Sequence, residues 1–136
     1  MPTDDERAYA EDRFGREIVI WLTTVRADGQ PQSSPVWFWW DGQAFWIWSI
    51  PTSGKVPNIR RNPKVSLHLE GDGTGGQIVT VEGAAELVDR SVLDVPEYVA
   101  KYHDLVVGMG ADDESFGRQY SVGIRVAPTR LRVYVD

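Results

Sequence analysis

Residues 33–50, SSPVWFWWDGQAFWIWSI, hold five of the six tryptophans of this 136-residue chain. The dipeptide Asp41-Gly42 is typical of a tight turn and divides the segment into two strands. Successive side chains of a strand point to opposite faces of a sheet, so these strands need an apolar cover on both faces. One face fits the core, and either a second subunit or the chain's own helices can cover the other. We expect a second subunit, because so much aromatic surface must be hidden.

The composition is that of an ordinary soluble globular protein with an acidic balance. The chain has 14 Lys and Arg against 20 Asp and Glu, a net charge of −6, whereas nucleic-acid-binding proteins are usually basic, so we expect no nucleic-acid partner. The absence of cysteine excludes disulfides and thiol chemistry. The N-terminal residues lack the apolar core of a signal peptide, and no run approaches the roughly 18 apolar residues of a membrane helix. We therefore expect a cytoplasmic protein without membrane contact, and one domain over residues 1–136.

Turn signals, caps and alternation predict six strands and four short helices. Helices are expected at about 3–14, where Thr3 and Glu6 match a capping box, at 54–62 and 96–107, and after a cap at Asp112 or Asp113. Six strands with tight turns predict a closed or nearly closed antiparallel barrel. The expected strands are 17–26, 32–40, 44–50, 64–70, 77–89 with a bulge or bend at Gly83, and 121–136 with an interruption at Pro128.

The chain carries few groups suited to direct catalysis. Two histidines without cysteine or a nearby carboxylate cluster argue against a metal site. The GxSxG, P-loop and GxGxxG motifs are absent, and no serine stands next to a recognisable base. If the protein is an enzyme, a bound cofactor supplies the chemistry.

Lys55 breaks a local preference. It falls in the first turn of the expected helix 54–62, where the positive end of the helix dipole disfavours a lysine. The hydroxyls of Thr52 and Ser53 and the permissive Gly54 precede it, so these groups suit a phosphate. A solvated lysine in a loop is the other interpretation, and the spacing alone does not choose. Arg60 and Arg61 lie at the favoured end of the same helix, from which one of them could reach a phosphate or a charged tail.

Over residues 18–87 the sequence resembles the pyridoxamine 5′-phosphate oxidase-like split barrels, and among them the actinobacterial branch that uses the deazaflavin coenzyme F420. The resemblance is carried by TVRADGQP at 24–31, PVWF at 35–38 and SGKVPNIRRNP at 53–63, and the C-terminal third fits loosely. It implies a mainly β fold, a six-stranded antiparallel split β-barrel with short peripheral helices. It also implies a homodimer with two cofactor sites at the subunit interface.

The resemblance also implies roles for residues of this chain. Residues 34–38 lie along the tricyclic ring, mostly through backbone groups, and Ser53 and Lys55 hold the phosphate. Ring contacts from the second subunit commonly come from the region around residues 77–79 and from the final strand. No catalytic side chain is expected, and Trp37 and Trp39 are candidates for the acceptor pocket. The candidate cofactor-binding residues are Ser34, Pro35, Val36, Trp37, Phe38, Ile50, Pro51, Thr52, Ser53, Gly54, Lys55, Asn58 and Arg60.

One departure bears on the choice of cofactor. Relatives that bind flavin mononucleotide (FMN) typically carry basic residues on the strand beside the ring, but no lysine or arginine occurs between Arg26 and Lys55. The expected function is therefore hydride transfer from reduced coenzyme F420 to a small organic acceptor. The alternatives are an FMN-dependent enzyme of the same fold, a non-catalytic protein that binds a cofactor or a porphyrin, and an aromatic cluster that serves only as core and subunit interface.

Overall fold

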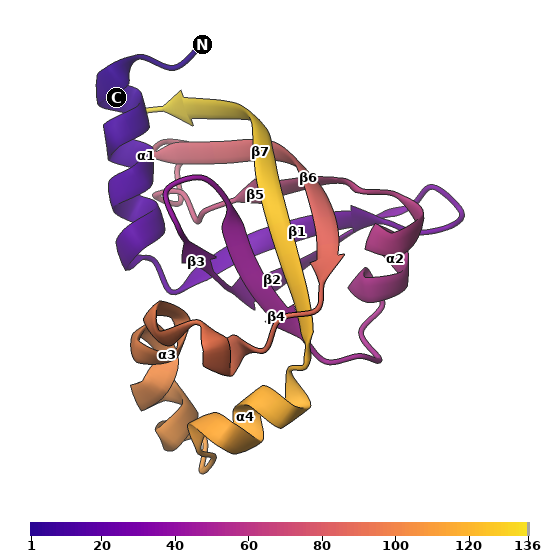
Figure 1. Ribbon diagram of the computed structural model, residues 1–136. Helices are drawn as coiled ribbons and strands as arrows, with labels where there is room; N and C mark the ends of the chain where they lie inside the picture. Colours follow the sequence, from indigo (N-terminus) through magenta and orange to yellow (C-terminus); the bar gives the residue numbers. More distant parts are fainter. Residues whose placement is uncertain (136) are drawn as a thin grey trace.

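The computed structural model describes residues 1–135. Seven strands form one antiparallel sheet in the order β2-β1-β5-β6-β7-β4-β3, and short helices pack around it (Figure 1). Along the chain the elements are α1 (Asp4–Arg16), β1 (Val19–Val25), β2 (Pro31–Trp37), β3 (Trp39–Trp40), β4 (Phe45–Ser49), α2 (Lys55–Arg61), β5 (Lys64–His68), β6 (Ile78–Val88), the 3-10 helix η1 (Val92–Asp94), α3 (Pro96–Gly108), α4 (Asp113–Gln119) and β7 (Val122–Tyr134).

The sheet curls back on itself. It starts at β2 and ends at β3, and only Phe38 separates these two strands in the chain. β2 and β4 approach each other without pairing, so the curled sheet is split along this line. Alternating side chains of the strands fill its interior, as a small barrel requires. The fully buried members of this core include Ile20, Leu22, Phe38, Phe45, Ile47, Leu67 and Ile124.

The strand count differs from the expectation because the predicted strand 32–40 is divided at Phe38. The backbone N–H of Phe38 donates to the Tyr102 hydroxyl (2.8 Å), and its carbonyl oxygen lies 2.9 Å from both that hydroxyl and the Lys101 ammonium. The Tyr102 hydroxyl also donates to the carbonyl of Ile18 at 2.6 Å. The backbone of Phe38 is thus satisfied by α3 instead of a neighbouring strand. The prediction of six strands was wrong, and the sheet has seven.

We expect Tyr102→Phe to lower the free energy of unfolding by about 1–3 kcal/mol, the usual cost of leaving buried polar groups without partners. The ring remains, but the Phe38 N–H and the Ile18 carbonyl lose their hydroxyl partner. Urea denaturation followed by tryptophan fluorescence measures the loss. An unchanged midpoint would show that water replaces the hydroxyl at this point.

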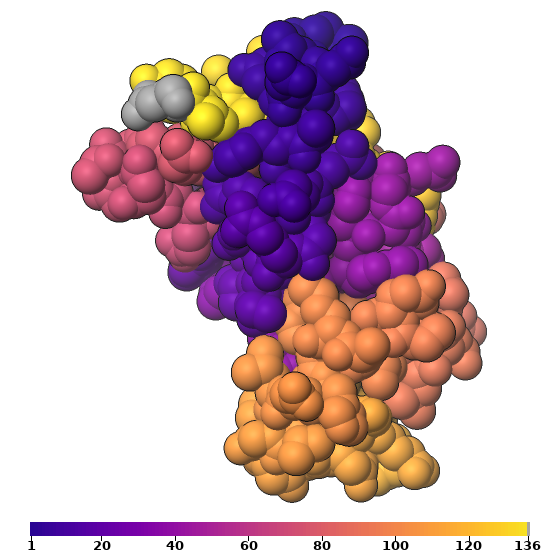
Figure 2. All heavy atoms as spheres, turned by 90° about the vertical axis from the view of Figure 1, so that its left-hand side faces the viewer, coloured from indigo at the N-terminus to yellow at the C-terminus, as the bar shows by residue number. Residues whose placement is uncertain are grey.

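The second apolar face of the tryptophan-rich strands is covered by the chain's own helices. Trp46 and Trp48 are buried with residues of η1, α3 and α4. The Trp37 ring stacks on Tyr102 at 4.6 Å between centroids and on Phe116 at 5.6 Å. Figure 1 shows these helices grouped at one end of the sheet, and Figure 2 shows them as a lobe below α1. These helices bury Trp46 and Trp48, whereas Trp37 and Trp39 are only partly buried. That a second subunit completes the cover stays a prediction, as does dimerisation itself.

The remaining elements follow the sequence pattern closely. The Thr3–Glu6 capping box opens α1, and Asp112 caps α4. The expected irregularity at Gly83 is confirmed by a register shift between Glu82 and Gly83. The expected interruption at Pro128 was wrong, because β7 is continuous and takes up the shift with one extra residue, Thr129. The 3-10 helix η1 was not predicted.

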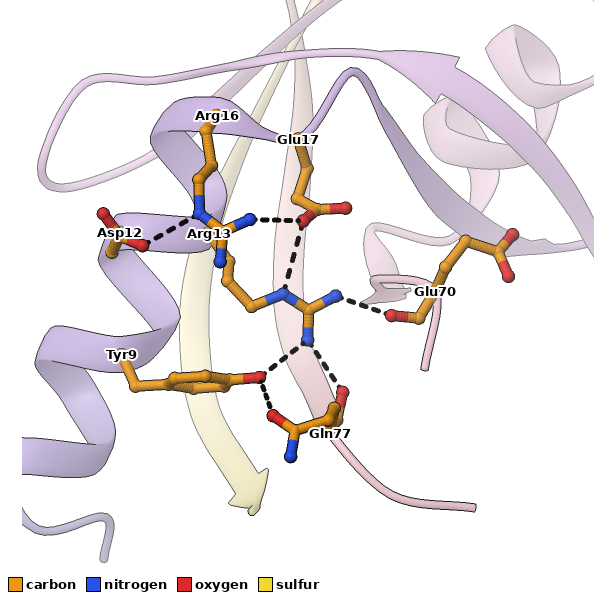
Figure 3. A network of polar contacts seen from close by, with 7 residues as sticks. All are labelled: Tyr9, Asp12, Arg13, Arg16, Glu17, Glu70 and Gln77. Carbon is orange, nitrogen blue, oxygen red and sulfur yellow. Dashed lines mark hydrogen bonds and ion pairs between the residues drawn. The ribbon is translucent and has the colours of Figure 1, made fainter. Parts of the chain in front are cut away.

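Helix α1 is fastened to the sheet by a buried arginine (Figure 3). Arg13 is only 6% exposed, and its guanidinium donates to the backbone carbonyls of Gln77 (2.7 Å) and Glu70 (2.6 Å). It also pairs with Glu17 at 3.4 Å, and the Tyr9 hydroxyl donates to the Gln77 side chain at 2.5 Å. Glu70 and Gln77 flank the glycine-rich loop 71–76, so one side chain of α1 holds both ends of that loop.

Candidate functional site

The main cavity lies at the split between β2 and β4. It has a volume of about 400 Å³, within the range of pockets that hold small molecules. Its walls come from three places: the end of β2, the end of β4 with the turn that follows, and the helices α3 and α4. The lining residues are Pro35, Val36, Trp37, Trp48, Ser49, Ile50, Ser53, Lys55, Tyr98, Met109, Phe116 and Tyr120.

The two strands that flank the cavity turn unpaired edges toward the split. Within the described residues β2 pairs only with β1, and the part of β4 beyond Trp46 pairs only with β7. Such an edge presents backbone N–H and C=O groups without ladder partners. Pro35 lies on the β2 edge, where the missing N–H of a proline is tolerated. The split therefore offers backbone polar groups to a ligand, while the side chains beside it are largely apolar.

A second cavity of about 200 Å³ lies next to the first, since Ser53 and Lys55 line both. Its other lining residues are Thr24, Gln32, Ser33, Ser34 and Gly54, so its walls carry hydroxyl and amide groups. Together the two cavities form a groove with an aromatic end and a polar end. We call this the split groove, and Lys55 and Ser53 stand at its middle.

Lys55 is the one cationic residue that lines the split groove, and no acidic residue lines it. Its ammonium is half-buried, and its hydrogen bond within the described residues goes to the Ser53 hydroxyl at 2.8 Å. Burial alone lowers the pKa of Lys55. Helix α2 begins at Lys55, and no side chain of the described residues caps it. A partly desolvated positive charge without a counter-ion, next to an uncapped helix start, suits an anionic group.

The structure brings eight of the predicted cofactor residues to the split groove and places five elsewhere. Phe38 is buried in the core, Asn58 donates to Thr24 (3.0 Å) and Gln32 (3.3 Å), and Pro51, Thr52 and Arg60 are exposed outside both cavities. Of the acceptor candidates, Trp37 lines the larger cavity. Trp39 packs against the buried cluster that Trp46 and Trp48 form with η1, α3 and α4. The residues at the groove are Ser34, Pro35, Val36, Trp37, Ile50, Ser53, Gly54 and Lys55.

The third wall, contributed by α3 and α4, was missed. Tyr98, Met109, Phe116 and Tyr120 all line the larger cavity, although they lie far from β2 in the sequence. A signal was present, because Tyr98 and Tyr102 lie one helical turn apart and thus share a face of α3. Phe116 and Tyr120 repeat this spacing, and their rings stack at 4.4 Å.

Other site classes find little support in the described part of the chain. No cluster of three or more histidine, cysteine or acidic side chains that could hold a metal ion occurs in it. His68 stacks on Trp21 at 6.2 Å, and His103 pairs with Asp113 at 3.0 Å on the surface. Among residues 1–135, no helix is both long and apolar enough to cross a membrane.

Fold and groove together define a small split β-barrel protein whose cleft follows the split. The family model for pyridoxamine 5′-phosphate oxidase matches residues 8–134, and the chain belongs to this family. No curated protein matches the chain significantly.

Several solved structures share the fold. The conserved hypothetical protein Rv2991 from Mycobacterium tuberculosis is 27% identical, with a TM-score of 0.72 over 99% of this chain and 86% of that one. An F420 reductase is 25% identical, with a TM-score of 0.70 over 90% and 94%. A putative pyridoxamine 5′-phosphate oxidase from Listeria innocua is 22% identical, with a TM-score of 0.71 over 93% and 95%, and at this identity it shows the fold alone.

Proposed function

We propose that the protein is an oxidoreductase that binds reduced coenzyme F420 in the split groove and transfers hydride to a small organic acceptor. The family includes oxidases, and the similar structures include an F420 reductase. The single observation that carries the proposal is the Lys55 ammonium, which is half-buried at the middle of the groove without an acidic partner.

The groove fits the parts of a deazaflavin cofactor. Lys55 and Ser53 would hold the phosphate, and the aromatic end, with Trp37, has the room and the apolar walls that a flat ring needs. The hydroxyl and amide groups of the smaller cavity suit a polar chain or tail. The phosphate would also offset the charge that burial makes unfavourable at Lys55.

Coenzyme F420 is preferred to FMN because the groove has so little positive charge. Lys55 is needed for the phosphate, which leaves neutral side chains around the remaining walls. The backbone edge of β2 can contact the polar rim of a ring, but no lysine or arginine of β2 or β4 stands beside it. FMN remains the alternative cofactor within the same groove.

In this proposal the chain itself binds the cofactor, aligns the acceptor with it and shields both from water. The reduced deazaflavin, when bound, supplies the hydride. Val36, Trp37, Phe116 and Tyr120 all line the larger cavity, so they would hold a flat ring by apolar contact and shield it from water. Holding donor and acceptor in contact contributes to rate without a catalytic side chain. A hydride-transfer site of this kind needs no nucleophilic side chain.

A side-by-side titration tests the proposal. Purified protein is titrated with coenzyme F420 and with FMN, and binding is followed through the fluorescence of Trp37 and Trp48, which line the larger cavity. We expect saturable quenching by F420 and a higher melting temperature, because a ligand of the native state stabilises it. Tighter binding of FMN would transfer the proposal to that cofactor. No response to either would overturn it.

Heme is the second candidate ligand. Met109, Tyr98 and Tyr120 line the larger cavity, and thioether and phenol groups both occur as heme ligands. A heme titration in the same series decides between the two. Binding of heme with exclusion of F420 would favour a non-catalytic porphyrin-binding protein.

We further propose a homodimer, on the basis of the resemblance, with one cofactor per chain. The η1, α3 and α4 residues already bury Trp46 and Trp48, so only part of the tryptophan-rich surface is left for a second subunit to cover. The role left for a second subunit is to close the open side of the split groove. Sedimentation equilibrium at twice the mass of the chain would support the dimer, and a monomer in the presence of saturating F420 would refute it.

A further inference from the structure

Within the described residues, neutral groups hold the ammonium of Lys101 on α3. It donates to the Phe38 carbonyl at 2.9 Å and lies 3.9 Å from the centre of the Phe38 ring and 5.2 Å from that of the Tyr102 ring. None of the ion pairs among residues 1–135 includes Lys101. A ring face and a carbonyl attract a cation, but neither supplies the full counter-charge of a carboxylate.

The surroundings of Lys101 make its neutral form more accessible than that of an ordinary lysine. Burial lowers the pKa of Lys101 to about 8, and the charge of Glu17 offsets only part of this effect. Arg13 and Arg16 both pair with the same Glu17 carboxylate at 3.4 Å, which weakens its hold on a third cation. At pH 7.5 about a quarter of the Lys101 side chains are therefore uncharged, against about one in a thousand for a lysine at the ordinary value of 10.5.

The neutral amine of Lys101 stays in place and within reach of solvent. The side chain is half-buried, so a small reagent can approach it from outside. A neutral amine still has an N–H to donate to the Phe38 carbonyl, and its lone pair is free. Partly desolvated lysines of this kind are nucleophiles. Lys101 lines neither cavity of the split groove, so this reactivity belongs to a separate position on the molecule.

We propose that Lys101 is an acylation site, that its ε-amine takes an acyl group from an activated acyl donor, and that the modification loosens α3 from the break at Phe38. The amine lone pair attacks the acyl carbon, and the bond from that carbon to the phosphate or thiolate of the donor breaks. The leaving group keeps the bonding pair, water takes the amine proton, and nothing is oxidised or reduced. The inference goes beyond the proposed function, because it requires neither F420 nor FMN.

An acyl group suits this position better than a charged modification. The amide is uncharged and planar, so it can lie against the Phe38 and Tyr102 rings. A carbamate or a phosphoryl group would place negative charge beside the Phe38 carbonyl and the negative faces of the rings. Acylation also removes the positive charge, and with it the attraction of the ammonium to both rings. The hold of α3 on the Phe38 backbone then depends mainly on the Tyr102 hydroxyl.

The test uses the small number of lysines in the chain, which are Lys55, Lys64 and Lys101. Native protein is treated with acetyl phosphate and, in parallel, with acetyl-coenzyme A between pH 6.5 and 9.5, and peptide mass spectrometry gives the initial rate at each lysine. The exposed Lys64 is the matched control. At pH 7.5 we expect Lys101 to react about tenfold faster than Lys64, because its larger neutral fraction outweighs the lower nucleophilicity of a less basic amine.

The pH profile and a denatured control separate the folded environment of Lys101 from chance reactivity. The rate at Lys101 should reach half its maximum at about pH 8 and then level off, whereas the rate at Lys64 should continue to rise. In concentrated urea the two rates should become equal. An excess at Lys101 with one donor alone supports the site and identifies the donor class. Equal rates at the two lysines in the native protein, or no reaction at Lys101 with either donor, overturn the inference.

The structural effect is measured on chains that carry acetyl-lysine at position 101 or at position 64. Acetylation at 101 should lower the urea midpoint and accelerate hydrogen exchange of residues 37–39, whereas acetylation at 64 should change neither. Lys101→Arg keeps a cation beside the rings and should stay close to the wild type. Lys101→Gln, which is uncharged but smaller than acetyl-lysine, should show the same two changes in weaker form. Unchanged exchange at residues 37–39 in both uncharged forms would overturn the loosening of α3.

Discussion

Lys55→Ala should weaken the binding of coenzyme F420 by about 10- to 100-fold. A hydrogen bond from a charged group contributes about 1.5–3 kcal/mol, and each 1.4 kcal/mol is a factor of ten in affinity. The alanine removes both the ammonium and its contact with Ser53, so the phosphate would lose its only cation in the groove. Fluorescence titration of wild type and variant under identical ionic strength measures the change. Lys55→Gln keeps a donor without the charge, so its affinity should lie between the two.

The pH dependence of binding gives a second measurement on the same residue. Burial lowers the pKa of Lys55 in the free protein from its ordinary value of 10.5, and a bound phosphate raises it again. Affinity should therefore be constant while Lys55 is fully charged in the free protein. It should fall as the pH rises through the lowered pKa toward that of the complex. In Lys55→Ala this fall should be absent.

Lys64→Ala is the matched control, since it removes the same charge from an exposed position at the start of β5. We expect its affinity for F420 to stay within about twofold of the wild type, as for a screened surface charge. Equal losses of F420 affinity in the two variants would show that Lys55 acts only through the net charge of the protein. An unchanged affinity in Lys55→Ala would refute the phosphate assignment, whatever the outcome for the acceptor.

Arg13→Ala should lower the free energy of unfolding by about 2–4 kcal/mol. The variant leaves the carbonyls of Glu70 and Gln77 without their donor and removes one of the two arginines that pair with the Glu17 carboxylate, and unsatisfied buried groups are among the costliest defects. Urea denaturation measures the loss. Hydrogen exchange should also accelerate in the loop 71–76, since both of its ends are held by this guanidinium. Arg13→Lys should recover only part of the lost free energy of unfolding, because an ammonium lacks the planar fork of the guanidinium that reaches two carbonyls.

Arg16→Ala serves as the control for the helix itself. Arg16 lies on α1 three residues after Arg13, and its side chain is exposed, so its pairs with Asp12 at 2.9 Å and with Glu17 at 3.4 Å each contribute at most about 1 kcal/mol. A loss in Arg13→Ala no larger than that in Arg16→Ala would show that the buried network is not what fastens α1 to the sheet.

Features that depend on neighbouring residues were predicted well from the sequence. The capping box of α1, the start of α2 and the bulge at Gly83 each follow from a few adjacent residues. The proximity of Lys55 to the hydroxyl of Ser53 belongs to this class, because the two residues are two positions apart. The position of β2 beside the groove was predicted from the family resemblance, which places residues 34–38 along the cofactor ring.

The features that were missed or predicted wrongly share one physical cause. Each of them depends on contacts with residues that are distant in the chain. The break at Phe38 exists because Tyr102, 64 residues later, satisfies its backbone. The contacts of the buried Asn58 were likewise not predicted, because its amide donates to Thr24 and Gln32 from two distant strands. The cover of the tryptophans depends on Phe116 and its neighbours, whose position no local pattern predicts.

The placement of α3 and α4 has a consequence for how such a protein diversifies. β6 and β7 are adjacent antiparallel strands, yet residues 89–121 depart from the sheet between them and return with a complete wall of the larger cavity. Lengthening a connection of this kind adds little entropic cost, and the paired strands on either side keep their register. The barrel and Lys55 can thus stay unchanged and keep the proposed cofactor site, while residues 89–121 can be replaced by a different segment that admits a different acceptor.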